Sequence, residues 1–264
     1  MGILENIIVD KQREVLLKKG IISVSQLEKS TLFNEKTISL SKRLRESSSG
    51  IITEHKRRSP SKPIINNSFS VEDVVVGYQN AGACGISVLT DGKYFGGSLD
   101  DLILTKATTN IPILRKDFVV DPYQIIESKA YGADVILLIA AVLNREQIKM
   151  LSELAQNLGM EVLLEVHDSI ELENSIMPSI NMIGVNNRNL KTFEVDIEIS
   201  RKLSALIPNE FVKISESGID HTNTVRELRQ HGYRGFLMGE HFMKTENPGK
   251  NAGDFIQNLT HNLL

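Results

Sequence analysis

The fold is decided by the stretch GADVILLIAA, residues 132–141. Its apolar run is continuous rather than alternating, which is typical of strands covered on both faces, as in parallel sheets. Seven further short apolar runs flank it along the chain, and most of them are continuous in the same way. The eight runs are GIITEHK (50–56), GISVLT (85–90), IPILRK (111–116), DVILLI (134–139), EVLLEV (161–166), MIGVNN (182–187), FVKIS (211–215) and GFLMG (235–239).

The segments between these runs carry the signals of helices. In DPYQIIESKAYG, Asp121 is a candidate N-cap and Pro122 stands at the first helical position. A helix commonly stops at a glycine in the left-handed conformation, and four segments end in this way, at Gly82, Gly132, Gly159 and Gly232. The runs recur roughly every 20 to 35 residues, which is the length of one strand–helix unit.

Eight strand–helix units in about 210 residues predict the α/β class and a closed (βα)8 TIM barrel. The alternative is a doubly wound open sheet. That alternative is weaker, because an open sheet normally has fewer strands and because no G-x-G-x-x-G motif follows the first run.

Residues 1–46 differ from this repeating pattern and predict an N-terminal helical extension. Apolar residues recur on one side at helical spacing, at Ile3, Leu4, Ile7 and Ile8. Gly20 is a candidate stop for this first helix, and SVSQLEKS and NEKTISLSKRLRESSSG predict further short helices. We expect one domain over residues 1–264, with the extension at 1–46 and the barrel at 47–264. The extension either covers a pocket or caps the barrel.

Composition narrows the class of protein. The chain has 264 residues, of which 41% are hydrophobic and 24% charged, and its net charge of −3 argues against a nucleic-acid partner. One cysteine, Cys84, rules out a disulfide framework and argues against a thiolate metal site. The N-terminus lacks a secretory pattern, and no apolar run approaches the roughly 20 residues of a membrane span. We expect a soluble, cytoplasmic protein without a membrane partner.

Charged side chains stand at the ends of the runs, where a barrel places its active site. Because side chains alternate along a strand, Glu54 and Lys56 share one face of the first run, and Lys116 and Glu165 share the apolar inner faces of theirs. Ionised groups in such a place cost several kcal/mol unless they are paired. Held together, they shift each other's proton affinities, as acid–base catalysis requires. A fourth strand adds Asn186 and, just beyond it, Arg188.

The loops after the last two runs predict a phosphate site. They read SESGI (215–219) and GEHF (239–242), and their small residues let backbone N–H groups approach an anion closely. These two loops are the usual phosphate cradle of such barrels. Ser59 and Ser61, across the ring closure, supply further hydroxyl donors.

Taken together, these motifs resemble the indole-3-glycerol phosphate synthase family. The matching pieces occur in the family's order and cover nearly all of residues 50–243. They are TEHKRRSPSKP (53–63), SVLTDGKYFGGS (87–98), ILRKDFVVDPYQI (113–125), GADVILLIAA (132–141), LLEVHD (163–168), GVNNRNLKTFEVD (184–196), SESGI (215–219) and LMGEHFM (237–243).

The resemblance implies a reaction and a set of site residues. The implied substrate is 1-(2-carboxyphenylamino)-1-deoxyribulose 5-phosphate, a phosphorylated small molecule, and the products are indole-3-glycerol phosphate, CO2 and water. No cofactor or metal is implied. The expected catalytic residues are Glu54, Lys56, Lys116, Glu165 and Asn186. The expected substrate-binding residues are Ser59, Phe95, Arg188, Glu216, Ser217, Gly218, Gly239 and Glu240.

Two positions depart from the family pattern. Many relatives carry a small residue where this chain has Glu240; its N–H can still donate to phosphate, but its carboxylate must turn away. Asn189 replaces a common Asp, with little expected effect on the chemistry. We expect His55, His167 and Cys84 to be structural, and the protein to be a monomer.

Several alternatives stay open from the sequence alone. Which of Glu54, Lys56 and Glu165 acts as acid or base in the dehydration is undecided. Another barrel enzyme that acts on a sugar phosphate, such as an isomerase of the tryptophan pathway to which the resembled family belongs, would share the phosphate cradle. A non-catalytic barrel that binds a phosphorylated metabolite is the competing class.

Overall fold

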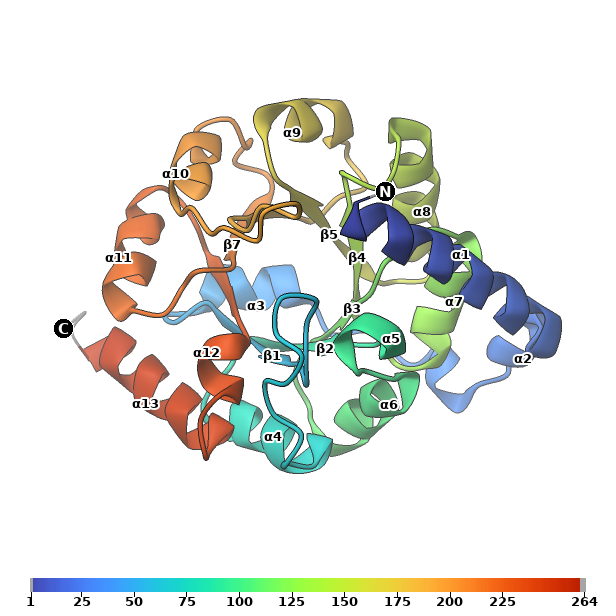
Figure 1. Ribbon diagram of the computed structural model, residues 1–264, viewed down its shortest axis with the longest axis horizontal. Coiled ribbons are helices and arrows are strands. Elements are labelled where there is room, and N and C mark those ends of the chain that lie inside the picture. Colours follow the sequence, from blue (N-terminus) through green and yellow to red (C-terminus); the bar gives the residue numbers. More distant parts are fainter. Residues whose placement is uncertain (1, 262–264) are drawn as a thin grey trace.

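The protein is a closed barrel of eight parallel strands in a computed structural model that describes residues 2–261. Each strand pairs with its sequence neighbours, and β1 pairs with β8 to close the ring. The predicted (βα)8 TIM barrel is therefore confirmed (Figure 1). The strands are β1 Ile51–His55, β2 Gly85–Leu89, β3 Ile113–Lys116, β4 Val135–Ile139, β5 Glu161–Val166, β6 Met182–Asn186, β7 Val212–Glu216 and β8 Gly235–Met238.

Helices surround the ring, as the glycine-terminated segments predict (Figure 1). Asp121 caps its helix by accepting a hydrogen bond from the backbone N–H of Tyr123, with Pro122 at the first position. The four stop glycines all take positive φ angles, between 78° and 87°. The helices after β1 are α4 Val71–Asn80, α5 Gly92–Phe95, α6 Leu99–Thr108, α7 Pro122–Ala130, α8 Arg145–Asn157, α9 Ser169–Ser175, α10 Glu198–Ser204, α11 Thr222–Gln230, α12 Glu240–Met243 and α13 Pro248–His261.

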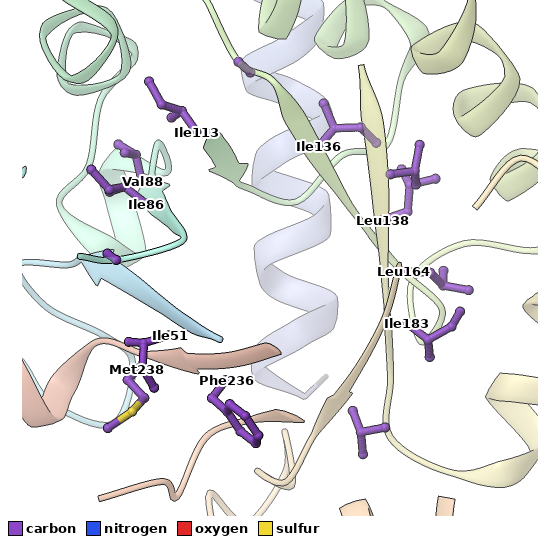
Figure 2. Packing of buried hydrophobic residues seen from close by; sticks show 14 of the residues in the cluster. Ile51, Ile86, Val88, Ile113, Ile136, Leu138, Leu164, Ile183, Phe236 and Met238 are labelled. Atoms are coloured by element: carbon purple, nitrogen blue, oxygen red, sulfur yellow. The ribbon is translucent and has the colours of Figure 1, made fainter. Parts of the chain in front are cut away.

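Alternation along the strands divides the apolar core into two layers. Side chains such as Ile51, Ile136 and Leu138 point outward from the ring toward the helices (Figure 2). Their neighbours, including Ile52 and Leu137, fill the barrel interior. This alternation fixes which residues at the strand ends face the mouth of the barrel.

The N-terminal extension forms α1 Ile3–Ile21, α2 Val24–Leu27, the 3-10 helix η1 Thr31–Asn34 and α3 Leu40–Glu46. Gly20, the predicted stop of the first helix, lies inside the last turn of α1. The helix ends one residue after it, because the chain becomes extended at Ile22, whose N–H still donates to the Lys18 carbonyl at 2.8 Å.

The extension reaches both ends of the barrel. Leu40 and Leu44 of α3 are fully buried and belong to the interior layer. They lie against Gly85 and Gly235 at the beginnings of β2 and β8, where an added Cβ would come within 2.7 and 3.2 Å of them. Helix α3 therefore plugs the N-terminal end of the barrel, and it lies behind the strands in Figure 1, whereas α1 lies in front.

Helix α1 is held over the opposite end by a buried lysine. Lys11 is only 2% exposed, and its Nζ lies 2.9 Å from Asp91 and 3.0 Å from Asp117, which follow β2 and β3. Burial alone lowers the pKa of Lys11, but Asp117, Asp91 and Glu14 raise it overall, so the side chain stays charged. We call α1 the strap, because this ion pairing fastens it across the strand ends.

None of the helices between residues 2 and 261 is long and apolar enough to cross a membrane.

Candidate active site

A cavity of about 300 Å³ opens at the C-terminal ends of the strands. All of the expected site residues line it, and the structure brings them together from seven strand ends and the segments that follow them. They are Glu54, Lys56, Ser59, Phe95, Lys116, Glu165, Asn186, Arg188, Glu216, Ser217, Gly218, Gly239 and Glu240.

Lys116 is the centre of the charged group. Its Nζ lies 3.0 Å from Oε2 of Glu165 and 3.5 Å from Oε2 of Glu216. On the other side of the mouth, the Nζ of Lys56 lies 2.7 Å from Oε1 of Glu54. The first pairing joins the ends of β3, β5 and β7, while the second stands at the end of β1. The mouth therefore carries Lys116 with two carboxylate partners and Lys56 with one.

The carboxylates beside Lys116 differ in their surroundings. Burial raises the pKa of Glu165, but Lys116, His167 and a hydrogen bond from Asn186 outweigh it, so the pKa is lowered overall. Burial raises the pKa of Glu216 to about 7, and Lys116 only partly offsets this. For Lys116 itself, burial lowers the pKa, but Glu165, Glu216 and Glu54 raise it above its ordinary value.

Glu216 lies tightly against the neighbouring strand. Its Oε1 is buried and has no hydrogen-bond partner within residues 2–261. A Cβ added to Gly184 of β6 would come within 2.3 Å of that oxygen. The glycine in MIGVNN therefore leaves the space that the Glu216 carboxylate occupies.

Asn186 ties the acid–base group to the loops that follow β6 and β7. Its Nδ2 donates to Oε1 of Glu165 at 3.1 Å, and its Oδ1 accepts from the Ser217 hydroxyl at 2.9 Å. The Arg188 backbone N–H donates to the same Oδ1 at 3.0 Å. Ser217 and Gly218 take φ angles of 68° and 74°, so the loop after β7 turns sharply at the cavity.

The rest of the predicted phosphate end comes from the loops after β1 and β8. Gly239 lies so close to Glu54 that a Cβ there would be 2.5 Å from its Oε1. Glu240 forms an ion pair with Lys62, from the loop after β1. The hydroxyl of Ser59 lies 3.1 Å from that of Ser61. The carboxylate of Glu240 thus has a cationic partner at the cavity rim.

One wall of the cavity is apolar, and sequence reasoning assigned only part of it. The Phe95 ring lies 6.1 Å from the ring of Phe118, centroid to centroid. The strap adds Ile3, Leu4 and Ile7, which line the cavity. Their helical spacing was visible in the sequence, but nothing there indicated which surface they would face. Phe118 gave a signal only through its place directly after the Lys116-Asp117 pair.

The residues expected to be structural fall into two groups. His55 and Cys84 are buried outside the cavity, and the Cys84 thiol lies 3.0 Å from the Ser47 hydroxyl. His167 is different, because its ring lies behind Glu165 with Nε2 3.5 Å from Oε1 of that residue. Within residues 2–261, no group of three or more His, Cys, Asp or Glu side chains is arranged to hold a metal ion.

Comparison with known proteins agrees with the family resemblance seen in the sequence motifs. The family model for indole-3-glycerol phosphate synthase matches residues 4–255. A protein of that name from Bacteroides thetaiotaomicron is 47% identical over 255 residues, covering 97% of this chain and 98% of its own. Another from Aliarcobacter butzleri is 41% identical, covering 92% and 94%.

Solved structures with low sequence identity share the fold alone. The 3-hexulose-6-phosphate synthase of Salmonella typhimurium superposes with a TM-score of 0.63 at 13% identity, over 80% of this chain and 99% of its own. Thiamine phosphate pyrophosphorylase from Pyrococcus furiosus gives 0.60 at 16% identity, over 82% and 98%.

Proposed function

The chain belongs to the indole-3-glycerol phosphate synthase family, and from that premise we propose which side chains at the barrel mouth carry out the reaction. The enzyme is a carboxy-lyase of tryptophan biosynthesis. It closes a ring in 1-(2-carboxyphenylamino)-1-deoxyribulose 5-phosphate, then releases CO2 and water to form indole-3-glycerol phosphate. The observation that carries our assignment is that Lys116, Glu165, Glu54 and Lys56 line one cavity, beside the loops that follow β7 and β8.

Lys116 serves the ring closure. As the aromatic carbon attacks the ketone carbon, negative charge develops on the carbonyl oxygen. The neighbouring carboxylates keep Lys116 protonated, so it can stabilise and protonate that oxygen. A charged group already positioned at the developing negative charge typically stabilises the transition state by a few kcal/mol. Decarboxylation then returns electrons to the aromatic ring that attacked the ketone and restores its conjugation.

Glu165 is the proposed base of the dehydration. Its pKa is lowered, so it is ionised at neutral pH, and Asn186 holds one of its oxygens in place. The departing hydroxyl needs a proton at the same time, and the paired Lys56 and Glu54 supply the acid on the opposite side of the mouth. This division of roles places the base at the end of β5 and the acid at the end of β1, on opposite sides of the ring.

The two ends of the cavity suit the two ends of the substrate. We assign the phosphate to the loops that contain Ser59, Ser217, Gly218, Gly239 and Glu240, because small residues there expose backbone N–H groups. The aromatic ring fits the apolar wall formed by Phe95 and the strap. Arg188 and Asn186 lie between the two ends and orient the substrate, which lowers the entropic part of the barrier.

We further propose that the protein is a monomer that acts in the cytoplasm without nucleic acid. The net charge of −3 gives no general attraction to a polyanion, and a single buried cysteine suits a reducing compartment. Sedimentation velocity at micromolar concentration tests the oligomeric state, and a dimer would contradict it.

Replacing the central lysine tests the assignment. Because the chain has no tryptophan, formation of the indole product can be followed by fluorescence over a low background. Lys116→Ala should lower kcat by about 10³-fold, as expected for losing one charged group at the developing alkoxide, with substrate binding largely retained. Lys149→Ala is the matched control, because that side chain is two-thirds exposed on α8. Near-normal turnover by the Lys116 variant would remove this residue from the mechanism.

A further inference from the structure

His167 links the buried Glu165 to the surface of the barrel. It directly follows β5, and its ring lies between two carboxylates. Its Nδ1 is 3.1 Å from Oε2 of Glu171 on α9, and its Nε2 is 3.5 Å from Oε1 of Glu165. The side chain of Glu165 is 3% exposed, whereas that of Glu171 is 21% exposed. The three side chains form a row from the site to solvent.

The ring is fixed on one side and unpartnered on the other. Both Nδ1 and the backbone N–H of His167 contact Oε2 of Glu171, the latter at 2.8 Å. Nε2 is buried and makes no hydrogen bond within residues 2–261, although it faces Glu165. Such a group is expected to gain its partner when the site tightens around substrate.

The charges around the ring favour its protonated form. Burial lowers the pKa of His167, but the Glu171 hydrogen bond and the charges of Glu165, Glu171 and Glu216 raise it overall. Lys116 is the cation that faces this group, and it contacts Glu165 at Oε2, the oxygen opposite to the one His167 faces. The Glu165 carboxylate therefore lies between His167 and Lys116, each of which can carry a proton.

The reaction consumes one proton from solvent in each turnover. The substrate's aromatic carboxylate leaves as neutral CO2, so its negative charge must be balanced by one added proton. Counted by step, the carbonyl oxygen gains one proton, the departing hydroxyl gains a second, and one proton is removed as the indole aromatises. The buried acid–base group must be resupplied with the difference.

We propose that His167 is the positioning and proton-relay residue that returns this proton to the site through Glu165. The inference rests on the proposed function. In the step, the Nε2–H bond of protonated His167 breaks and an O–H bond forms at Oε1 of Glu165. After ring closure has taken a proton from Lys116, the Glu165 carboxyl group turns and gives its proton to the neutral amine of Lys116, so the O–H bond breaks and an N–H bond forms. The proton that Glu165 takes up later, as the indole aromatises, is returned to the Glu54–Lys56 pair, which has protonated the departing hydroxyl, so one proton enters through His167 in each turnover. His167 regains a proton from water beside Glu171, and no electrons are transferred.

Two variants test the relay. His167→Asn removes the titrating ring and should lower kcat at least about 10-fold, the low end of proton-transfer effects, with KM changed less than about twofold. Added imidazole should restore part of the lost kcat, and the solvent deuterium isotope effect on kcat should rise. The control is His231→Asn, because that histidine is exposed at the end of α11, away from the cavity.

Glu171→Gln keeps the ring but removes the charge that raises its pKa. Since the protonated ring is the donor, the alkaline limb of the kcat profile should move to lower pH. A structural role for Glu171 would not move this limb.

The outcomes separate the possible failures. Unchanged kcat in His167→Asn, or a lower kcat that imidazole does not restore and that leaves the isotope effect as in the wild type, overturns the relay. An unmoved alkaline limb in Glu171→Gln also overturns it. If the wild-type protein makes no indole product in the same assay, the proposed function itself fails instead.

Discussion

Glu165 and Glu216 show how neighbours decide the chemistry of a residue. Both are buried glutamates beside Lys116, yet their pKa values move in opposite directions. Glu165 receives a hydrogen bond from Asn186 and faces His167 as well as Lys116. Glu216 is farther from the lysine, has one unpartnered oxygen, and is repelled by the other carboxylates. Carboxylates whose pKa values are pushed apart in this way can take different roles.

The raised pKa of Glu216 predicts a pH dependence of stability. A carboxyl whose folded pKa, about 7, exceeds its unfolded value contributes stability that is complete below the unfolded pKa, near 4, and is lost as pH rises through 7. Glu216→Gln mimics the protonated form. Between pH 5 and 8, the free energy of unfolding of the wild type should fall relative to this variant by up to about 3 kcal/mol.

Urea unfolding at steps of pH measures this difference. Glu153→Gln is the control, because that side chain is half exposed on α8 and should give a difference that does not vary with pH. A flat difference for Glu216→Gln as well would show that Glu216 is ionised throughout this range.

Strand alternation was enough to predict which side chains meet at the mouth. Glu54, Lys116 and Glu165 follow directly from their positions relative to apolar inward residues. The contact of His167 with Glu165 was missed, because it lies past the end of β5, where alternation no longer applies. The different surroundings of Glu165 and Glu216 depend on cross-barrel distances that no local pattern contains.

At the scale of elements, α1 was only half predictable. The apolar spacing of Ile3, Leu4 and Ile7 indicated a helix that docks. It did not indicate that Lys11 on the same helix is buried, because a helical lysine is normally solvated. Its partners Asp91 and Asp117 lie far away in the sequence and come close only when β2 and β3 stand side by side.

Removing the charge of Lys11 should loosen the strap. Lys11→Met leaves the buried Asp91 without its cation and leaves Asp117 with Arg115 as its remaining partner, which typically costs about 3 kcal/mol or more. Because α1 lines the apolar wall, KM should rise about tenfold with a smaller change in kcat. Backbone amides of residues 3–10 should exchange hydrogen faster with solvent.

Lys19→Met is the matched control on the same helix. Its side chain is 43% exposed and pairs with Asp121, so its loss should cost less than about 1 kcal/mol and leave KM unchanged. Equal effects of the two substitutions on KM and exchange would contradict the strap, since only Lys11 is buried against the strand ends.

For the whole molecule, the barrel was predictable because each strand–helix unit carries its own signals. The two roles of the extension were not, because both depend on the closed ring. α1 lies over the mouth, whereas α3 inserts Leu40 and Leu44 into the opposite end. The expected boundary between the extension and the barrel, at residues 46 and 47, therefore separates α3 from the barrel whose interior α3 fills.

Two truncations should separate these roles. Removing residues 1–22 deletes the strap but keeps α3, so the remaining chain should fold into the barrel and lose most of its turnover. Removing residues 1–46 also deletes Leu40 and Leu44, and each buried leucine typically contributes 2–5 kcal/mol. That loss is comparable to the whole stability of many domains, so this second chain should not fold.

Circular dichroism measures folding, and fluorescence of the indole product measures turnover. The shorter truncation should show a cooperative thermal transition, and the longer one should show none. If the longer truncation folded as well as the shorter one, α3 would be a surface helix rather than a plug. If the shorter truncation kept full turnover, the apolar contacts of Ile3, Leu4 and Ile7 would have no part in holding the substrate.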